Sequence, residues 1–567
     1  MKKLVFFALA IILVLSGVLV GCGGTTTTTA TQTATQTSTQ TVTSTATSTA
    51  TTTATTTSTT TATVTATPTN PLGDLAKPAG GKGGGRLQLV GAGNIANIGD
   101  PNAISNPGDA AYAFPVIEPL LVIGSDGNIK PWLAEKFEIA PDGSSITLYL
   151  RHGVSFSDGT PFNAEAAKYN LDNGINSKVW PNMQAVQDCT IVDDYTVKVN
   201  FKNGKFDWGA TKSMAGFFSC DMFSPTSLQN NDEDWQRTHV VGTGPFILTS
   251  FQRDQKLTYD ANPNYWRGAP YLNGVDYNII PDTTTQLLAY KSGEVDAIGV
   301  QASDAQDLIS SGYQILTSTD MIINLCLIPS SNNPDSPLAK LKVRQAVESA
   351  IDKQALVDGL SYGYGHVSNQ EFTENLATYD PTVVGNPYNP DRAKELLTEA
   401  GYPDGFTTQL WMADFIPMDL PLALQDQLSK VGITLQVKKI SIVQLNDMIA
   451  TGGQGWEGFM YSFGFPGTTT DPASTLLNGP LNGNTTWISC NEPQELLDLA
   501  AKAAGEIDQT KRNQDYQEIS KKMEDTYLQW IFLYWSPTLT SVAPYVKGVT
   551  MGKYTEFWPY TFAYLDK

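Results

Sequence analysis

The residue types that carry covalent chemistry are few and scattered along this chain. Its three histidines, His152, His239 and His366, stand alone in the sequence, and no His-Glu-x-x-His zinc motif is present. The cysteines show no spacing typical of a zinc site. Acidic residues are plentiful, but none stands in a context typical of glycoside hydrolysis. We therefore expect neither a catalytic site nor a bound metal or cofactor.

Residues suited to non-covalent binding gather in one late segment, 464–472. This segment combines Phe465 with a hydroxyl-rich stretch that includes Thr468, and it ends on Asp471 and Pro472. Such a loop suits an oligosaccharide, because sugar rings stack on aromatic side chains and sugar hydroxyls need many hydrogen bonds. The aromatic candidates for such contacts are Phe465, Trp411 and Tyr364. For each of these three side chains, a place in the hydrophobic core is an equal alternative.

The first residues predict export and lipidation. Lys2 and Lys3 precede a nearly unbroken apolar run from Leu4 to Leu19, a length that suits a signal peptide and is short for a membrane span. The run ends in Leu19-Val20-Gly21-Cys22, which resembles the lipobox of bacterial lipoproteins. In those proteins cleavage precedes the cysteine, whose sulfur receives a diacylglycerol. We expect a signal peptide over residues 1–21 and a lipid anchor on Cys22; an ordinary secretory signal is the alternative.

A tract of threonine, alanine, serine and glutamine follows the leader. It carries no charge and almost no large side chain between residues 25 and 70. Such a composition cannot bury enough apolar surface to offset the entropy of ordering, so the tract is predicted to be disordered. Residues 22–83 are therefore interpreted as a flexible linker between the anchor and a folded body.

The body of about 490 residues is too long for one hydrophobic core, which predicts two or three domains. The net charge of −20 argues against nucleic acid or an anionic membrane surface as a partner. Export places the chain in an oxidising environment, where two disulfides are compatible with the four cysteines of the body. We favour a pair between Cys189 and Cys220, and a pair between Cys326 and Cys490 is left open.

Helices and strands are mixed in the body without regular alternation. Alternating apolar residues predict strands at 145–150, 195–199 and 433–437, and turn sequences stand at 141–143 and 157–160. Helices are predicted at 343–351, 418–430 and 495–521. Asn389, Pro390 and Gly401 mark the start and the end of a further helix. The fold class is therefore α/β or α+β.

Short motifs run through the body in a fixed order. They are Glu118-Pro119-Leu120, Pro131-Trp132-Leu133-Ala134-Glu135, residues 150–162, Gly242-Thr243-Gly244-Pro245-Phe246, residues 262–268, residues 291–297, Val343-Arg344-Gln345-Ala346, residues 350–353 and residues 400–406. In order and spacing they resemble the bacterial extracellular solute-binding proteins of family 5, the peptide-binding components of ABC importers. The resemblance covers nearly everything from Arg86 to Lys567. Trp132 and Trp266, which lie inside these motifs, are interpreted as core anchors rather than ligand contacts.

The resemblance implies a periplasmic-binding-protein fold with two α/β lobes around a cleft and a third, smaller, strand-rich domain. The chain then passes between the lobes twice. Lobe I is expected to comprise residues 84–118, 240–318 and 530–567, and lobe II residues 319–529. The small accessory domain of lobe I is expected to cover residues 119–239.

The resemblance also bears on the ligand. In peptide-binding relatives, a tryptophan stands at the position of Phe465, and an aspartate just before the Asp-Pro step pairs with the α-amino group of the peptide. Counting back from Asp471 places Thr468 at that position here. The family resemblance therefore makes an oligopeptide the expected ligand, and an oligosaccharide is the alternative.

Taken together, the sequence predicts a non-enzymatic lipoprotein at the outer face of the cytoplasmic membrane. It would capture a solute between two lobes and deliver it to ABC permease subunits driven by cytoplasmic ATPases. A tethered surface hydrolase is the competing class.

Overall fold

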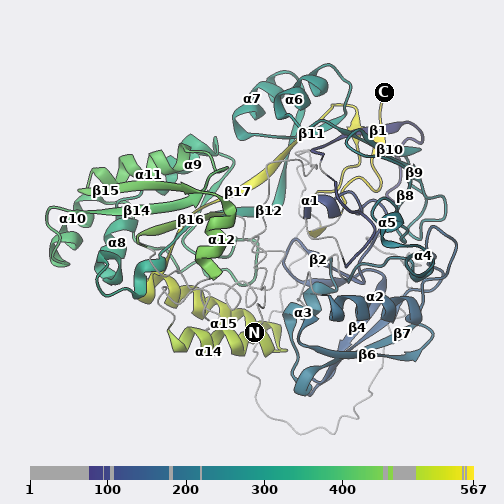
Figure 1. Ribbon diagram of the computed structural model, residues 1–567, viewed down its shortest axis with the longest axis horizontal. Coiled ribbons are helices and arrows are strands. Elements are labelled where there is room, and N and C mark those ends of the chain that lie inside the picture. Colours follow the sequence, from purple (N-terminus) through teal and green to yellow (C-terminus); the bar gives the residue numbers. More distant parts are fainter. Residues whose placement is uncertain are drawn as a thin grey trace, which may run out of the picture.

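The computed structural model describes residues 76–93, 95–102, 107–177, 183–216, 220–450, 457–463, 493–551, 554–555 and 558–567. The leader, the threonine-rich tract, Cys490 and the segment 464–492 lie outside these ranges, so the predictions for them remain predictions. Helices and strands of the described residues pack around three separate hydrophobic clusters (Figure 1). None of the described helices is long and apolar enough to cross a membrane.

The first lobe is defined by the cluster that draws on residues 87–117, 240–316 and 542–565. Its four-stranded sheet has the order β1-β10-β9-β8, in which β1 and β10 are parallel and the other pairs antiparallel. The strands are β1 (Arg86–Gly91), β8 (Phe246–Gln252), β9 (Lys256–Ala261), β10 (Gly274–Ile279) and the small pair β18 (Val546–Lys547) and β20 (Tyr564–Leu565). The helices are α1 (Pro107–Ala110), α4 (Pro225–Asn230), α5 (Glu233–Gln236), α6 (Thr283–Lys291) and α7 (Ala302–Ser310).

The accessory domain is defined by the cluster that spans residues 120–222. An antiparallel sheet of order β4-β5-β7-β6 packs against α2, and a small sheet of order β19-β2-β3 lies beside it. The elements are β2 (Leu121–Gly124), β3 (Ile129–Pro131), β4 (Ala134–Ile139), β5 (Ser145–Leu150), α2 (Ala164–Asn176), β6 (Val186–Asp193), β7 (Thr196–Phe201), α3 (Trp208–Ser213) and β19 (Tyr554–Thr555).

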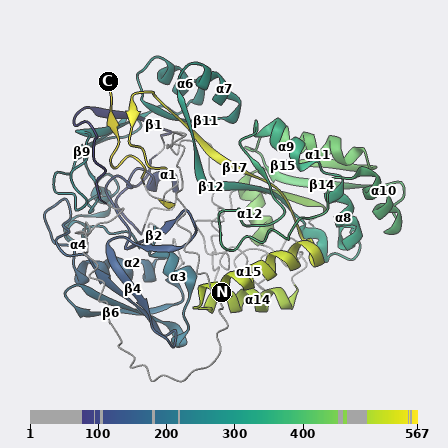
Figure 2. The same cartoon turned by 180° about the vertical axis from the view of Figure 1, so that it is seen from behind.

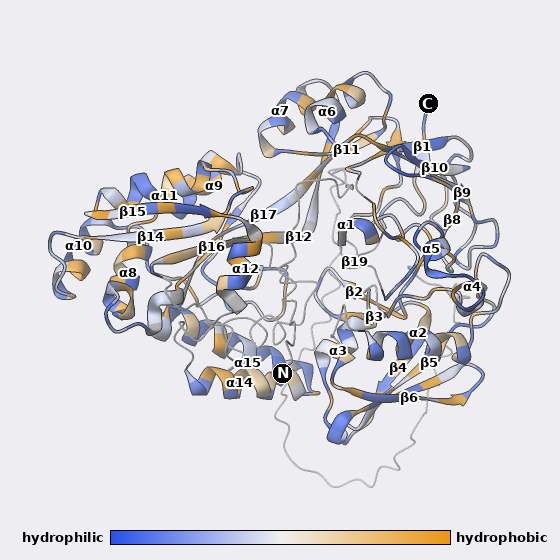
Figure 3. Ribbon diagram, viewed as in Figure 1, coloured by the Kyte–Doolittle hydropathy of each residue, from blue (hydrophilic) through white to orange (hydrophobic). Residues whose placement is uncertain are grey.

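The second lobe is defined by the cluster that spans residues 323–535. Its sheet has the order β11-β17-β12-β16-β14-β15, with β13 paired to β17. The strands are β12 (Gln314–Leu327), β13 (His366–Val367), β14 (Phe406–Ala413), β15 (Ile433–Ile440), β16 (Phe459–Phe463) and β17 (Trp530–Val542). The edge strand β11 (Ala297–Val300) belongs to the same sheet, but its residues pack in the first-lobe core. The helices are α8 (Leu341–Ser349), α9 (Lys353–Leu360), α10 (Pro390–Glu399), α11 (Asp419–Ser429), α12 (Ile442–Ala450), α14 (Gln494–Gly505) and α15 (Gln509–Lys522). Several of these helices alternate hydrophobic and hydrophilic residues along their length (Figure 3), as amphipathic helices do.

Local sequence signals explain several of these elements. The predicted strand at 145–150 is β5, and the predicted strand at 433–437 lies inside β15. Asn389 caps α10 by accepting a hydrogen bond from the Arg392 backbone N–H at 3.0 Å, and Gly401 after the helix has a φ of 91°. The expected helix at 495–521 is instead two helices, α14 and α15, because the Asp508 side chain accepts hydrogen bonds from Thr510 and Lys511 and starts a new helix.

One buried carboxylate connects the first lobe to the accessory domain. Glu118 is fully buried, and each of its oxygens accepts two hydrogen bonds. The donors are Trp132 Nε1 (3.0 Å) and Tyr265 Oη (2.8 Å) to Oε1, and Thr243 Oγ1 (2.9 Å) and Trp266 Nε1 (2.9 Å) to Oε2. Burial raises the pKa of Glu118, whereas these donors lower it. Trp132 and Trp266 thus hold this polar centre in place through their indole N–H groups, which is a structural role.

The disulfide expected between Cys189 and Cys220 is not formed. Both side chains lie in the accessory-domain core, and Cys326 is buried in the second-lobe core without a disulfide. Burial raises the pKa of the Cys189 thiol, and it raises the pKa of Cys326 to about 12. Because the thiolate is the species that reacts in disulfide exchange, these apolar surroundings keep the thiols unreactive.

Replacing Glu118 tests how much the fold depends on this carboxylate. Glu118→Ala leaves four buried donors without their acceptor, and we expect it to lower the free energy of unfolding by roughly 3–5 kcal/mol. Urea unfolding followed by tryptophan fluorescence measures the change. Glu138→Ala, at an exposed position on β4, is the matched control and should unfold like the wild type. Equal stability of the two variants would show that Glu118 does not hold the structure together.

A second buried acid, Glu371, makes stability depend on pH. It follows β13, and its Oε1 has no hydrogen-bond partner within the described structure. Burial raises the pKa of Glu371 from 4.5 to about 8. The folded protein therefore retains a proton that the unfolded chain loses, so this residue reduces stability as the pH rises from about 4.5 to about 8.

Glu371→Gln should remove this dependence. We expect the variant to gain stability over the wild type progressively between pH 4.5 and pH 8, by up to about 4 kcal/mol, and to gain nothing further above that range. Urea unfolding across this pH range measures the difference. Glu374→Gln, three residues later and exposed, is the control. A difference that stays constant with pH would contradict the assignment of a buried, protonated carboxyl group.

Candidate functional site

Two long strands, β12 and β17, connect the two lobes. They pair along most of their length, and Leu316 and Val542 belong to the first-lobe core whereas Leu325 and Phe532 belong to the second-lobe core. Figures 1 and 2 show this strand pair crossing between the lobes. Among the described residues, the cores of the first and second lobes are therefore connected through this strand pair, which we call the bridge.

The bridge has an irregularity where it leaves the first lobe. The register of β12 against β17 shifts between Thr317 and Met321, and Met321 is paired with Pro537. Proline has no backbone N–H and cannot donate to the ladder. Next to it, the Thr538 N–H donates to the Ser318 hydroxyl at 3.0 Å, so a side chain replaces a backbone acceptor. Such irregularities bend a strand locally, and a second register shift follows between Asn324 and Leu325, so the ladder of the bridge is interrupted twice.

A chain of polar side chains lies at the second-lobe end of the bridge. The Tyr461 hydroxyl donates to Asn324 Oδ1 at 2.7 Å, and Asn324 Nδ2 donates to the Ser536 hydroxyl at 3.1 Å. The Ser536 and Ser361 hydroxyls are 3.4 Å apart. These contacts link β16, β12 and β17 to the end of α9 and hold the loop that follows this helix against β17.

That loop carries Tyr364, one of the predicted ligand contacts. Tyr364 is half-buried, and its backbone N–H donates to the Ser361 carbonyl at 2.8 Å. The preceding Tyr362 is 58% exposed and has a φ of 50°, an uncommon conformation for a bulky residue. Gly365 packs so closely on the Trp535 carbonyl that an added Cβ would lie 2.8 Å from that oxygen. The structure thus places Tyr364 beside the bridge.

The sequence of this loop contains a motif that sequence reasoning missed. Residues 359–363 have the Gly-x-Ser-x-Gly spacing of a hydrolase nucleophile turn, with Ser361 at its centre. A nucleophile turn requires a strand before the serine, whereas Ser361 follows helix α9 and has a φ of −106°. The local geometry therefore lacks the strand-to-helix turn that activates such a serine.

Trp411 lies on β14 in the same sheet. Its indole Nε1 donates to the Glu457 carbonyl at 3.0 Å, and its half-buried ring packs against the second-lobe core. Trp411 pairs with Met460 of β16, the strand next to β12, so the structure places it one strand farther from the bridge than Tyr461. Phe465, Thr468 and Asp471 follow β16 in the chain and lie outside the described residues.

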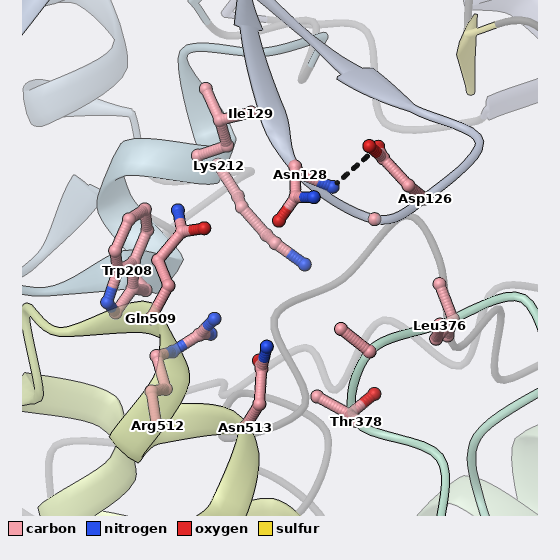
Figure 4. Close-up of a pocket in the computed structure, with 12 residues that line it drawn as sticks. Asp126, Asn128, Ile129, Trp208, Lys212, Leu376, Thr378, Gln509, Arg512 and Asn513 are labelled. Carbon is pink, nitrogen blue, oxygen red and sulfur yellow. Dashed lines mark hydrogen bonds between the residues drawn. The ribbon is translucent and has the colours of Figure 1, made fainter. Parts of the chain in front are cut away.

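A pocket lies on another side of the molecule, between the accessory domain and the second lobe (Figure 4). Its volume is about 30 Å³, enough for little more than water. The labelled side chains that line it are Asp126, Asn128, Ile129, Trp208, Lys212, Leu376, Thr378, Gln509, Arg512 and Asn513. A larger hollow of about 560 Å³ lies nearby, lined by residues that include Phe206, Asp207, Lys502 and Ile507. Among the described residues, no group of acidic, histidine and cysteine side chains is arranged to hold a metal ion.

Comparisons with known proteins agree with this architecture. The model of bacterial extracellular solute-binding proteins, family 5, matches residues 128–486, more than half of the chain. Heme-binding protein A of Haemophilus influenzae is 27% identical over 455 residues, which cover 74% of this chain and 81% of that protein. The glutathione-binding protein GsiB of Salmonella choleraesuis is 29% identical over 397 residues, covering 68% of this chain and 76% of the relative.

The fold is also similar to solved structures. The periplasmic binding protein DppA of Helicobacter pylori, solved in complex with the peptide STSA, superimposes with a TM-score of 0.68 at 21% identity. The alignment covers 86% of this chain and 99% of DppA. Together with the family match and the two lobes joined by β12 and β17, this establishes the predicted two-lobed fold. The chain belongs to the bacterial extracellular solute-binding proteins of family 5.

Proposed function

We propose that this protein is the lipid-anchored receptor of an ABC importer and that it captures a peptide between its two lobes. The observation that carries the proposal is the family match over residues 128–486, on a chain whose lobes are joined by β12 and β17. Ligand contact with both lobes stabilises a closed form that the permease subunits recognise, and the lipid on Cys22 keeps the receptor close to them. The chemistry is binding without turnover.

The proposed domain division follows the three hydrophobic clusters. Lobe I comprises residues 84–118, 240–318 and 530–567, the accessory domain residues 119–239, and lobe II residues 319–529. The clusters support most of this division, because the first-lobe cluster draws on three separate stretches of chain, whereas the other two are nearly continuous. They differ from it at residues 530–535, which pack in the second-lobe core, and at Phe223, which packs in the first-lobe core. Residues 1–21 are the proposed signal peptide and residues 22–83 the linker.

Peptides lead as the proposed ligand class. The names of two relatives support this: one binds glutathione, a tripeptide, and the structure of DppA contains the peptide STSA. The proposed ligand contacts are Trp411, Tyr364, Phe465, Thr468 and Asp471. Thr468 favours the second candidate, an oligosaccharide, because its hydroxyl lacks the charge that selects a free amine.

A ligand screen tests the proposal. Soluble protein beginning at residue 84 is heated with tripeptides, glutathione, heme and neutral oligosaccharides, and its melting temperature is recorded. A ligand at one hundred times its dissociation constant stabilises the folded state by about 2.7 kcal/mol, so at least one peptide should raise the melting temperature by several degrees. Stabilisation by oligosaccharides alone would contradict the peptide proposal, and conversion of a compound to products would make the protein an enzyme.

The role of Thr468 can be tested by restoring a carboxylate. Thr468→Asp should bind a tripeptide with a free amino terminus about tenfold more tightly than the wild type does, because a buried carboxylate pairs with the ammonium group. The N-acetylated tripeptide should gain nothing, and calorimetry measures both affinities. Thr470→Asp in the same segment is the control. Equal affinities of Thr468→Asp for the two peptides would remove Thr468 from the proposed site.

A further inference from the structure

The accessory domain contacts the second lobe through the turn between α14 and α15. The Trp208 indole Nε1 donates to the Glu506 carbonyl at 2.7 Å, and the Arg512 guanidinium lies over the Trp208 ring at 4.8 Å. Ile507, between them in the chain, packs against the accessory-domain core. Trp208 is almost fully buried, at 2% exposure, and it belongs to the accessory-domain core, so the joint meets the edge of that core. We refer to Trp208, Glu506, Ile507 and Arg512 as the joint.

Charge also acts across the joint. Burial raises the pKa of Asp207, and the positive charge of Arg512 opposes this shift. Asp207 begins α3 by accepting a hydrogen bond from the Ala210 N–H at 2.7 Å, which fixes Trp208 in the first turn of that helix. The accessory domain therefore presents the indole and an acidic group together to the basic side chain of α15.

A second contact lies beside the joint. Asn375 Nδ2 of the second lobe donates to the Ser125 carbonyl, in the turn between β2 and β3, at 2.6 Å. At Gly127 in the same turn, an added Cβ would lie 2.9 Å from Leu376 Cδ2, so the two surfaces are close together. Figures 1 and 2 show α14 and α15 beside α3, away from the β12 and β17 bridge.

The joint is small. The hollow of about 560 Å³ and the pocket of about 30 Å³ flank it, so much of the surface between the accessory domain and the second lobe is not packed. A permanent domain interface excludes such space and is well packed. The Glu118 centre provides the contrast, because its carboxylate is fully buried and accepts four hydrogen bonds.

These observations lead to a mechanical conclusion. Glu118 fixes the accessory domain to the first lobe, whereas the bridge of β12 and β17 is the irregular connection to the second lobe. When the second lobe moves away about the bridge, the joint must open. Its hydrogen bond, its cation–π interaction and the burial of Ile507 would be lost in that movement, so they favour the arrangement in which the accessory domain and the second lobe touch, which we call the closed form.

We propose that Trp208, Ile507 and Arg512 are positioning residues for solute capture, setting the balance between open and closed forms through the joint without touching the solute. The inference rests on the proposed function, since closure matters for a receptor that captures its ligand between lobes. Removing any one of these three interactions should shift the closed-to-open ratio toward the open form by a factor of about three to ten. Ligand affinity would then fall in proportion to the fraction of the protein that is closed, because only the closed form retains the ligand.

The test uses the unliganded protein and two conservative variants. Ile507→Ala shortens the apolar side chain on the second-lobe side and leaves the accessory-domain core intact, and Trp208→Phe keeps an aromatic ring but removes the Nε1 donor. The matched controls are Ile309→Ala on α7 and Trp235→Phe on α5, both outside the joint. Small-angle X-ray scattering measures the radius of gyration, and hydrogen exchange follows the segments 205–214 and 505–512.

We expect both joint variants to have a larger radius of gyration than the wild type and faster exchange in these two segments. Exchange around Glu118 should not change, which separates opening of the joint from unfolding of the accessory domain. The two controls should resemble the wild type. If Ile507→Ala has the radius of gyration and the exchange rates of the wild type, the proposal is overturned.

A ligand experiment complements the scattering. With any tripeptide found in the screen, Ile507→Ala should increase the dissociation rate constant three- to tenfold, and Ile309→Ala should leave it unchanged. An unchanged rate for Ile507→Ala would also overturn the proposal. If no peptide or sugar binds, the proposed function fails, whereas the scattering still decides whether the joint holds the lobes together.

Discussion

The arrangement of this protein depends on the buried carboxylate of Glu118. It stands where the chain leaves the first-lobe core and enters the accessory domain, and its four donors come from both bodies. Trp132 belongs to the accessory-domain core and Trp266 packs against it, whereas Thr243 and Tyr265 lie within the stretch 240–272, whose apolar residues pack in the first-lobe core. A buried charge is stable only when its hydrogen bonds are made, so this centre forces three distant stretches of chain into one place. Several of the motifs shared with the family are therefore requirements of folding.

The same conclusion holds for a motif of the second lobe. Arg344 is almost completely buried and donates to the carbonyls of Leu338, Ala339 and Tyr527. The Tyr527 carbonyl ends a π-helical turn, Met523–Tyr527, directly before β17. Arg344 therefore satisfies the carbonyls of an irregular helix end at the point where the chain turns into the bridge. Shared motifs of this kind define where the lobes and the bridge form, and they leave the identity of the solute to other residues.

Sequence patterns predicted elements well where the signal was local. The capping by Asn389, the alternation in 145–150 and the turn at 141–143 each depend on neighbouring residues, and each element formed as expected. The break at Glu506–Asp508 was missed because the apolar spacing continues across it. The structure does not contain the disulfide that we expected between Cys189 and Cys220. Closeness in sequence within one strand-rich region does not determine whether two cysteines form a bond. Tyr364 proved to lie in a loop beside the bridge and Trp411 in the bridging sheet, but no local signal distinguishes core from cleft for an aromatic residue.

From the sequence alone, periodicity and turn chemistry along the chain predicted the α/β class, and the ordered motifs indicated the family through their resemblance to known proteins. It could not determine which distant groups meet. Tertiary structure decided three such contacts: Glu118 joins the accessory domain to the first lobe, Pro537 lies opposite the register shift in β12, and Trp208 contacts the turn at Glu506. In each case the two partners are far apart in sequence, and they meet only because the packing of three cores brings them together.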